Sequence, residues 1–148
     1  MALLLCLVLA AVYFDIRTFR IPNRLIIFGI VLGVLYRGLS PGEHLVFYYL
    51  LSMAGMFFGL IPFYKIHAIG GGDVKLLSVC TLFTGWKCGL SIAIYALFYG
   101  GIISVIYLVY HRFISKDIKK KRHVIHFSIP IMLGVLTQSL WGGFLWQM

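Results

Sequence analysis

Three long apolar runs constrain this chain more than any other feature of its sequence. They are Leu45–Tyr64, Cys88–Tyr110 and Val124–Met148, and a helix that spans a bilayer needs about 20 mostly apolar residues. Hydrophobic residues make up 61% of the 148 residues and charged residues 11%, whereas a soluble domain is roughly half apolar and a quarter charged. No long polar segment is left to build a separate soluble domain. We therefore expect a single membrane-embedded, all-α domain over residues 1–148.

Three shorter apolar runs, Met1–Ile16, Ile21–Tyr36 and Val74–Trp86, raise the expected number of spanning helices to six. With the N-terminus outside, this topology places eleven of the thirteen Lys and Arg residues on the inner side, and only Arg37 and Lys87 outside. An excess of basic residues on the cytoplasmic side is the usual determinant of orientation. The net charge of +9 is therefore interpreted as loops facing anionic lipid, and nucleic acid is not expected as a partner.

Only four residues of the chain are acidic, and two of them are attached to apolar helices near the expected membrane boundary. Asp15 lies at the inner end of the first run and Asp73 at the inner start of the fourth. Two crossings separate them, so both return to the same face. Ionisable groups at such positions are costly and are functional candidates by default. Glu43 and Asp117 fall in expected loops and are interpreted as solvated charges.

Two carboxyl groups that lie close together do not both ionise easily, so the pair can share one proton. The ionised member can then take a proton from water, while the protonated member donates a hydrogen bond to a scissile carbonyl. This is the chemistry of aspartic proteases, which uses no metal or cofactor. The topology allows Asp15 and Asp73 to meet in this way at the cytoplasmic face.

Three glycines, Gly70, Gly71 and Gly72, stand directly before Asp73. Glycine lets the backbone turn freely and lets a substrate chain approach closely. We expect a flexible loop here that opens a small wet cleft beside the aspartate. The alternative is an ordinary cytoplasmic loop in which Asp73 is a helix N-cap.

Two motifs of the chain resemble those of the type IV prepilin peptidases, a family of membrane aspartic proteases. In that family the first aspartate ends helix one shortly before an I-P-N stretch, as Asp15 does before residues 21–23. The second belongs to a G-x-G-D motif followed by a hydrophobic residue and lysine, which corresponds to residues 70–75 here. The stretch HFSIPIMLG at 126–134 loosely resembles the proline-containing last helix of the family. The resemblance thus covers nearly the whole chain in order and spacing.

The resemblance implies an aspartic endopeptidase of the cytoplasmic (inner) membrane with Asp15 and Asp73 as its catalytic pair. Such enzymes remove a short basic leader from pilin, pseudopilin or Flp/Tad-type precursors. Long members also carry a domain with paired C-x-x-C motifs and N-methylate the mature subunit. Cys6, Cys80 and Cys88 form no C-x-x-C pair, so the chain looks like a short, peptidase-only form, and we expect no methyltransferase activity.

Weaker roles are assigned to three residues near the two aspartates. Pro22 suits the first turn of a helix, and Asn23 is expected to order the turn beside Asp15. Lys75 should point away from Asp73 on a helix and contact lipid phosphate or substrate.

The competing interpretation is a non-enzymatic membrane protein, either a transporter or a subunit of a pilus or secretion assembly. The two acids would then bind ions or protons, but such ligands are expected near the bilayer midplane and these lie at inner helix ends. A histidine metal site is not expected, because His67, His111, His123 and His126 would have to converge from different loops. The expected partners are a prepilin-like substrate and membrane lipids, and the sequence leaves the oligomeric state open.

Overall fold

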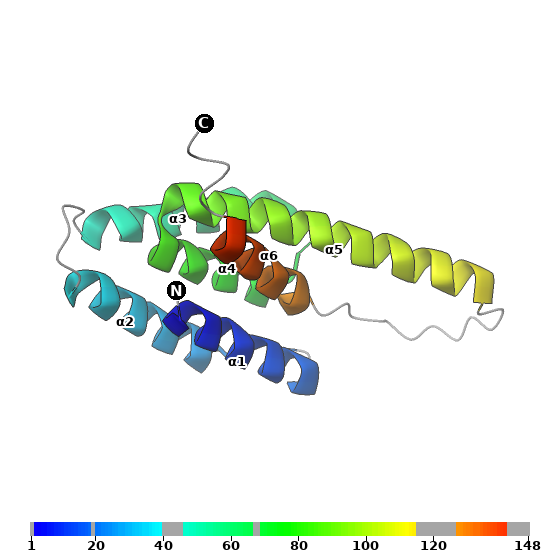
Figure 1. Cartoon of the computed structure of the whole chain (residues 1–148), viewed down its shortest axis with the longest axis horizontal. Coiled ribbons are helices and arrows are strands. Elements are labelled where there is room, and N and C mark those ends of the chain that lie inside the picture. The colour runs from blue at the N-terminus through cyan, green and yellow to red at the C-terminus, as the bar shows by residue number, and fades with distance from the viewer. Residues whose placement is uncertain (1, 19, 40–45, 67–68, 115–126, 142–148) are drawn as a thin grey trace.

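The computed structural model describes residues 2–18, 20–39, 46–66, 69–114 and 127–141, and in these ranges the all-α expectation is confirmed (Figure 1). Each helix falls on one of the apolar runs. The six helices are α1 (Ala2–Thr18), α2 (Asn23–Leu39), α3 (Val46–Lys65), α4 (Gly71–Thr84), α5 (Trp86–Ile114) and α6 (Ser128–Trp141).

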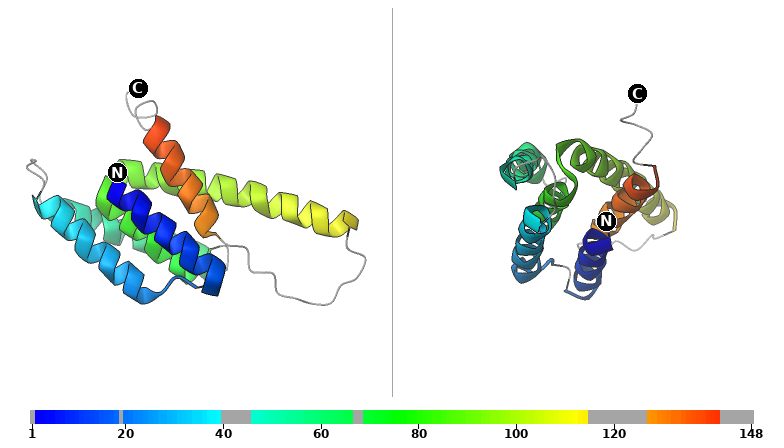
Figure 2. Two further views of the ribbon diagram at one scale, coloured as in Figure 1. Left: turned by 60° about the horizontal axis from the view of Figure 1, so that its bottom comes forward. Right: turned by 60° about the vertical axis from the view of Figure 1, so that its left-hand side comes forward.

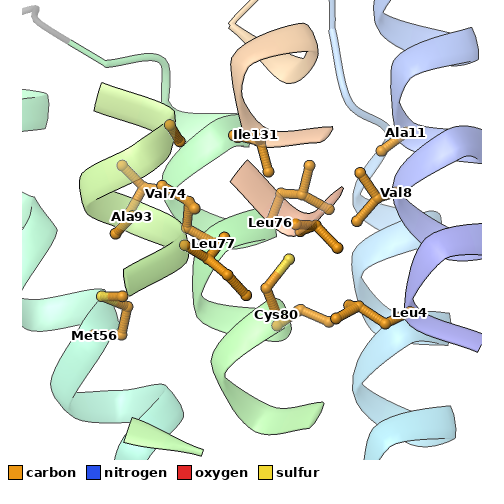
Figure 3. Packing of buried hydrophobic residues seen from close by; sticks show 14 of the residues in the cluster. Leu4, Val8, Ala11, Met56, Val74, Leu76, Leu77, Cys80, Ala93 and Ile131 are labelled. Atoms are coloured by element: carbon orange, nitrogen blue, oxygen red, sulfur yellow. The ribbon is translucent and has the colours of Figure 1, made fainter. Parts of the chain in front are cut away.

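The helix α4 is the centre of the structure, because it packs against all five other helices. Its eight consecutive residues Leu76–Phe83 are buried, as expected for a helix that is apolar all round. In Figure 3, Leu76 lies toward Val8 of α1, and Leu77 lies on the opposite side, toward Met56 of α3. Its neighbours shield α4, a helix of 14 residues, from its surroundings.

Within the residues that the structure describes, two helices, α3 and α5, are long and apolar enough to cross a membrane. In each, only 22% of the most apolar 18-residue window is buried in the protein, whereas the core helix of a soluble protein would be mostly buried. The exposed faces carry large apolar side chains such as Phe58 of α3 and Phe98 of α5, which are 67% and 65% exposed. These faces fit contact with lipid; the six crossings and their orientation stay predictions.

The last part of α5 extends beyond the other helices, as Figure 1 and the left view of Figure 2 show. A helix of 29 residues is about 44 Å long, which exceeds the roughly 30 Å of a hydrocarbon core. The projecting part is apolar and exposed, with Val105 and Ile106 both 62% exposed. Tilting would allow a helix of this length to lie within a bilayer.

The backbones of α5 and α6 approach each other closely at Gly134. A Cβ atom added to this glycine would lie 2.8 Å from the carbonyl oxygen of Ile92 and 3.2 Å from the amide nitrogen of Ala96. Both atoms belong to the backbone of α5 and cannot move aside as a side chain does. Gly134 therefore fixes where along α5 the last helix lies.

Replacing Gly134 by alanine should push α6 away from α5 and lower the free energy of unfolding by roughly 1–3 kcal/mol, the usual cost of overpacking. Thermal unfolding in detergent would measure the loss. Gly101→Ala is the matched control, since no atom lies within 4 Å of an added Cβ there, and its stability should stay the same or rise by up to about 1 kcal/mol. Equal midpoints for the two variants would contradict the packing argument.

Candidate active site

Asp15 lies in the last turn of α1 and is almost fully buried, with 8% of its surface exposed. Its partner comes from the other end of the chain. The hydroxyl of Ser128, the first residue of α6, donates a hydrogen bond of 2.6 Å to Oδ2 of Asp15. The first turn of α6 lies beside the last turns of α1 (Figure 2). A buried carboxyl group at this depth thus has a polar partner, as buried polar groups require.

Asp73 is the third residue of α4, so it is not the N-cap of that helix. The N-cap is Gly70, whose backbone is extended at φ −71° and ψ 148°. The carbonyl oxygen of Gly70 accepts the amides of Asp73 and Val74, each at 3.1 Å. The Asp73 carboxyl group in turn hydrogen-bonds the Gly70 backbone, as an acidic side chain at this helical position commonly does. The start of α4 therefore holds the carboxyl group in place.

The prediction of a flexible loop at Gly70–Gly72 is wrong. Only Gly70 precedes the helix, and the next two glycines form the first turn of α4. Among the described residues a positive φ occurs at Gly85 alone. Lack of space explains the glycines instead: an added Cβ at position 70 would lie 2.7 Å from Oδ2 of Asp73, and one at position 72 would lie 3.3 Å from Cβ of Ile21. The small residues let the aspartate and the turn after α1 come close to the backbone.

The structure brings Asp15 and Asp73 together, so that the charge of one acts on the other. Burial and, to a smaller extent, the charge of Asp15 raise the pKa of Asp73 from its ordinary 3.8 to about 7, against the opposing effect of the hydrogen bond to the Gly70 backbone. Asp73 precedes the apolar run that begins at Val74 and thus lies at its edge. A carboxyl group that keeps a proton near neutral pH, next to a second one, is suited to general acid–base work.

The two motifs around the aspartates are linked by a hydrogen bond between side chains. Nζ of Lys75 donates to Oδ1 of Asn23 at 2.9 Å, which joins the start of α4 to the start of α2. Pro22 stands directly before α2, and its carbonyl oxygen accepts the amides of Leu25 and Ile26 at 3.0 and 3.4 Å. Pro22 and Asn23 therefore order the turn that follows α1.

Ser128 is a site residue that the sequence did not reveal. A serine at the start of an apolar helix, two residues before Pro130, indicates a helix N-terminus and nothing more. Its contact with Asp15 depends on how α6 packs against α1, and no periodicity or spacing encodes that packing.

Several residues considered in the sequence lie outside the part of the chain that the structure describes. Within the described part, no three His, Cys, Asp or Glu residues are grouped so that they could hold a metal ion. The described residues do not include Glu43, His67, the basic stretch 116–122 with Asp117, His123 and His126, and they do not include the side chain of His111.

The helices and this pair define a class: a helical protein with membrane-length apolar helices and two carboxyl groups close enough for the charge of one to act on the other. The sequence profile of the type IV leader peptidase family matches residues 2–108. The chain therefore belongs to that family, which confirms the resemblance stated from the motifs. Searches of curated proteins and of solved structures each found no significant match.

The matched segment contains both aspartates and ends within α5, so α6 and Ser128 lie beyond it. Membership in the family makes the chain a type IV leader peptidase in the broad sense. Together with the two long apolar helices, it indicates that the protein associates with a membrane.

Asp73→Asn should raise the thermal unfolding midpoint, and the gain should be larger at about pH 8 than at about pH 5. The folded protein holds the proton of Asp73 more tightly than the unfolded chain does. The stability that this proton binding provides is therefore complete below pH 3.8 and is lost as the pH rises through about 7. The amide of the Asp73→Asn variant does not ionise, so the variant does not lose stability in this pH range. Unfolding in detergent at both pH values tests this, and a midpoint that falls equally at both would contradict it.

Proposed function

We propose that the protein is a membrane aspartic endopeptidase that removes the leader peptide of type IV prepilin-like precursors at the cytoplasmic face of the inner membrane. The observation that carries the proposal is the proximity of Asp15 and Asp73, which are 58 positions apart in the sequence and act on one another in the structure. Family membership supports the same activity. The substrates are pilins, pseudopilins or Flp/Tad-type subunits.

The two carboxyl groups divide the work of hydrolysis. Asp73, whose raised pKa keeps a proton near neutral pH, gives that proton to the oxygen of the scissile carbonyl. Asp15, in its ionised form, takes a proton from the water that attacks the carbonyl carbon. The resulting tetrahedral diol breaks its C–N bond as Asp15 passes the proton to the leaving amine and Asp73 recovers its own from a hydroxyl.

The cytoplasmic placement is supported by the charges around the pair. The end of α1, the turn into α2, the end of α3 and the start of α4 carry basic side chains, and an excess of Lys and Arg is typical of the cytoplasmic side of a membrane protein. These residues are Arg17, Arg20, Arg24, Lys65 and Lys75. A hydrophobic substrate helix in the same bilayer would reach the pair with its leader on the cytoplasmic side.

We assign the chain to the short, peptidase-only form of the family. The paired C-x-x-C motifs that accompany methylation in long members do not occur in the sequence. Family membership does not favour the alternative of a transporter or assembly subunit.

Asp15→Asn and Asp73→Asn should each abolish cleavage of a prepilin, because either change removes one half of the proton exchange, while the protein still accumulates in the membrane. Incubation of each purified variant with a prepilin, followed by gel analysis of the leader, measures this. Glu43→Gln and Asp117→Asn make the same carboxyl-to-amide change at the two remaining acids and should leave cleavage unchanged. Near-normal processing by either variant of the pair would refute the mechanism.

The N-terminal amine of the cleaved product should remain unmodified when S-adenosylmethionine is added to the reaction, because we expect no methyltransferase activity. Mass spectrometry of the mature subunit measures this directly. A product heavier by one methyl group would contradict assignment to the peptidase-only form without affecting the cleavage mechanism.

A further inference from the structure

We infer that Ser128 is a positioning residue for Asp15: its hydroxyl holds the carboxylate in the orientation in which it takes a proton from water. The inference rests on the proposed function and adds to it a residue of α6, beyond the segment that the family profile matches.

The contact is buried and joins two helices. Ser128 has no exposed surface and Asp15 has 8%, and Oγ and Oδ2 are 2.6 Å apart. A hydrogen bond to an ionised acceptor is shorter and stronger than one between neutral groups. Because water does not reach the serine, its hydroxyl cannot exchange this partner for solvent.

Other buried hydroxyls in the helices behave differently. Ser52, Ser78 and Thr81 each donate to the carbonyl oxygen four residues earlier in their own helix, the usual choice for such side chains. Ser128 is the first residue of α6, so no preceding helical turn offers it a carbonyl. Its place at the helix end is what directs its hydroxyl to Asp15.

Close packing of α6 on α5 sets this place. The ring of Phe127 lies against Gly100, where an added Cβ would be 2.5 Å from its Cε2 atom. The amide of Ile131 bonds to the carbonyl oxygen of Phe127 at 3.3 Å. Pro130 is tolerated in the first helical turn, since an N–H there has no partner within the helix. Together with the close approach at Gly134, these contacts fix the first turn of α6 on α5, and α6 also packs against α1.

The hydrogen bond has a defined effect on the carboxylate. With Oδ2 held by Ser128, rotation of the Asp15 side chain is restricted, and in the proposed step Oδ1 is the oxygen that takes the proton from water. Ser128 keeps its proton throughout; the proton from water goes to Asp15.

Ser128→Ala should lower kcat for prepilin cleavage roughly 10-fold or more, as loss of a hydrogen bond to a charged group implies, with KM little changed. Ser128→Thr, which keeps the hydroxyl, should recover most of the rate. Ser78→Ala is the matched control: it removes a hydroxyl that is also buried but bonds only to its own helix, and kcat should stay at the level of the unaltered protein. Thermal unfolding of each variant in detergent accompanies the kinetics.

The inference is overturned by a Ser128→Ala variant that is folded and as active as the unaltered protein, or by equal losses in Ser128→Ala and Ser78→Ala. If Ser128→Thr proves too bulky to fold, a double-mutant cycle takes its place. The changes in unfolding midpoint caused by Ser128→Ala and by Asp15→Asn should not add up in the double variant. Strict additivity of the two changes overturns the inference. Cleavage by the Asp15→Asn variant at the rate of the unaltered protein would instead refute the proposed function. The two failures are therefore distinguishable.

Discussion

The burial of α4 on all sides is the constraint on which the rest of the structure depends. Because α4 contacts all five other helices, its first turn lies where α1, α2 and α6 also meet. An acid in that turn is therefore brought to the acid near the end of α1 by core packing alone. Glycines at its start complete the arrangement, since larger residues would collide with Asp73 or with Ile21. The packing of α4 thus forms the core and also positions the candidate site.

The same burial destabilises the ionised form of Asp73, and the candidate mechanism uses the raised pKa that results. Removing Asp73 from water makes its ionised form less favourable, and a second acid nearby adds repulsion, so its pKa rises to about 7. A group of this kind lowers stability at neutral and higher pH. Perturbed carboxyl groups of this kind are concentrated at functional sites, and the family match makes that interpretation preferable to a purely structural one.

The sequence predicted what depends on apolar runs and on scarce residues. Six apolar runs became six helices in the described chain. Counting crossings predicted that Asp15 and Asp73 lie on one face; the crossings stay a prediction, and in the structure the charge of Asp15 acts on Asp73. The sequence did not predict the features that are determined by contacts between helices. A run of three glycines suggested a loop, yet two of them lie in the helix α4. Glycine is required there because neighbouring side chains lie close to the backbone, and not because the backbone must be flexible. The Lys75–Asn23 and Ser128–Asp15 hydrogen bonds join segments far apart in sequence, and only the helix packing determines them.

The cations closest in sequence to the two acids interact with neutral groups. Lys75, two residues from Asp73, donates to Asn23. Arg17, two residues from Asp15, lies over the Tyr13 ring, with Cζ 5.1 Å from the ring centre. A cation paired with either carboxyl group would lower its pKa and favour two ionised acids, which have no proton to share. Neutral partners for these cations, and a neutral donor for Asp15, therefore preserve the one condition that proton exchange between the carboxyl groups requires.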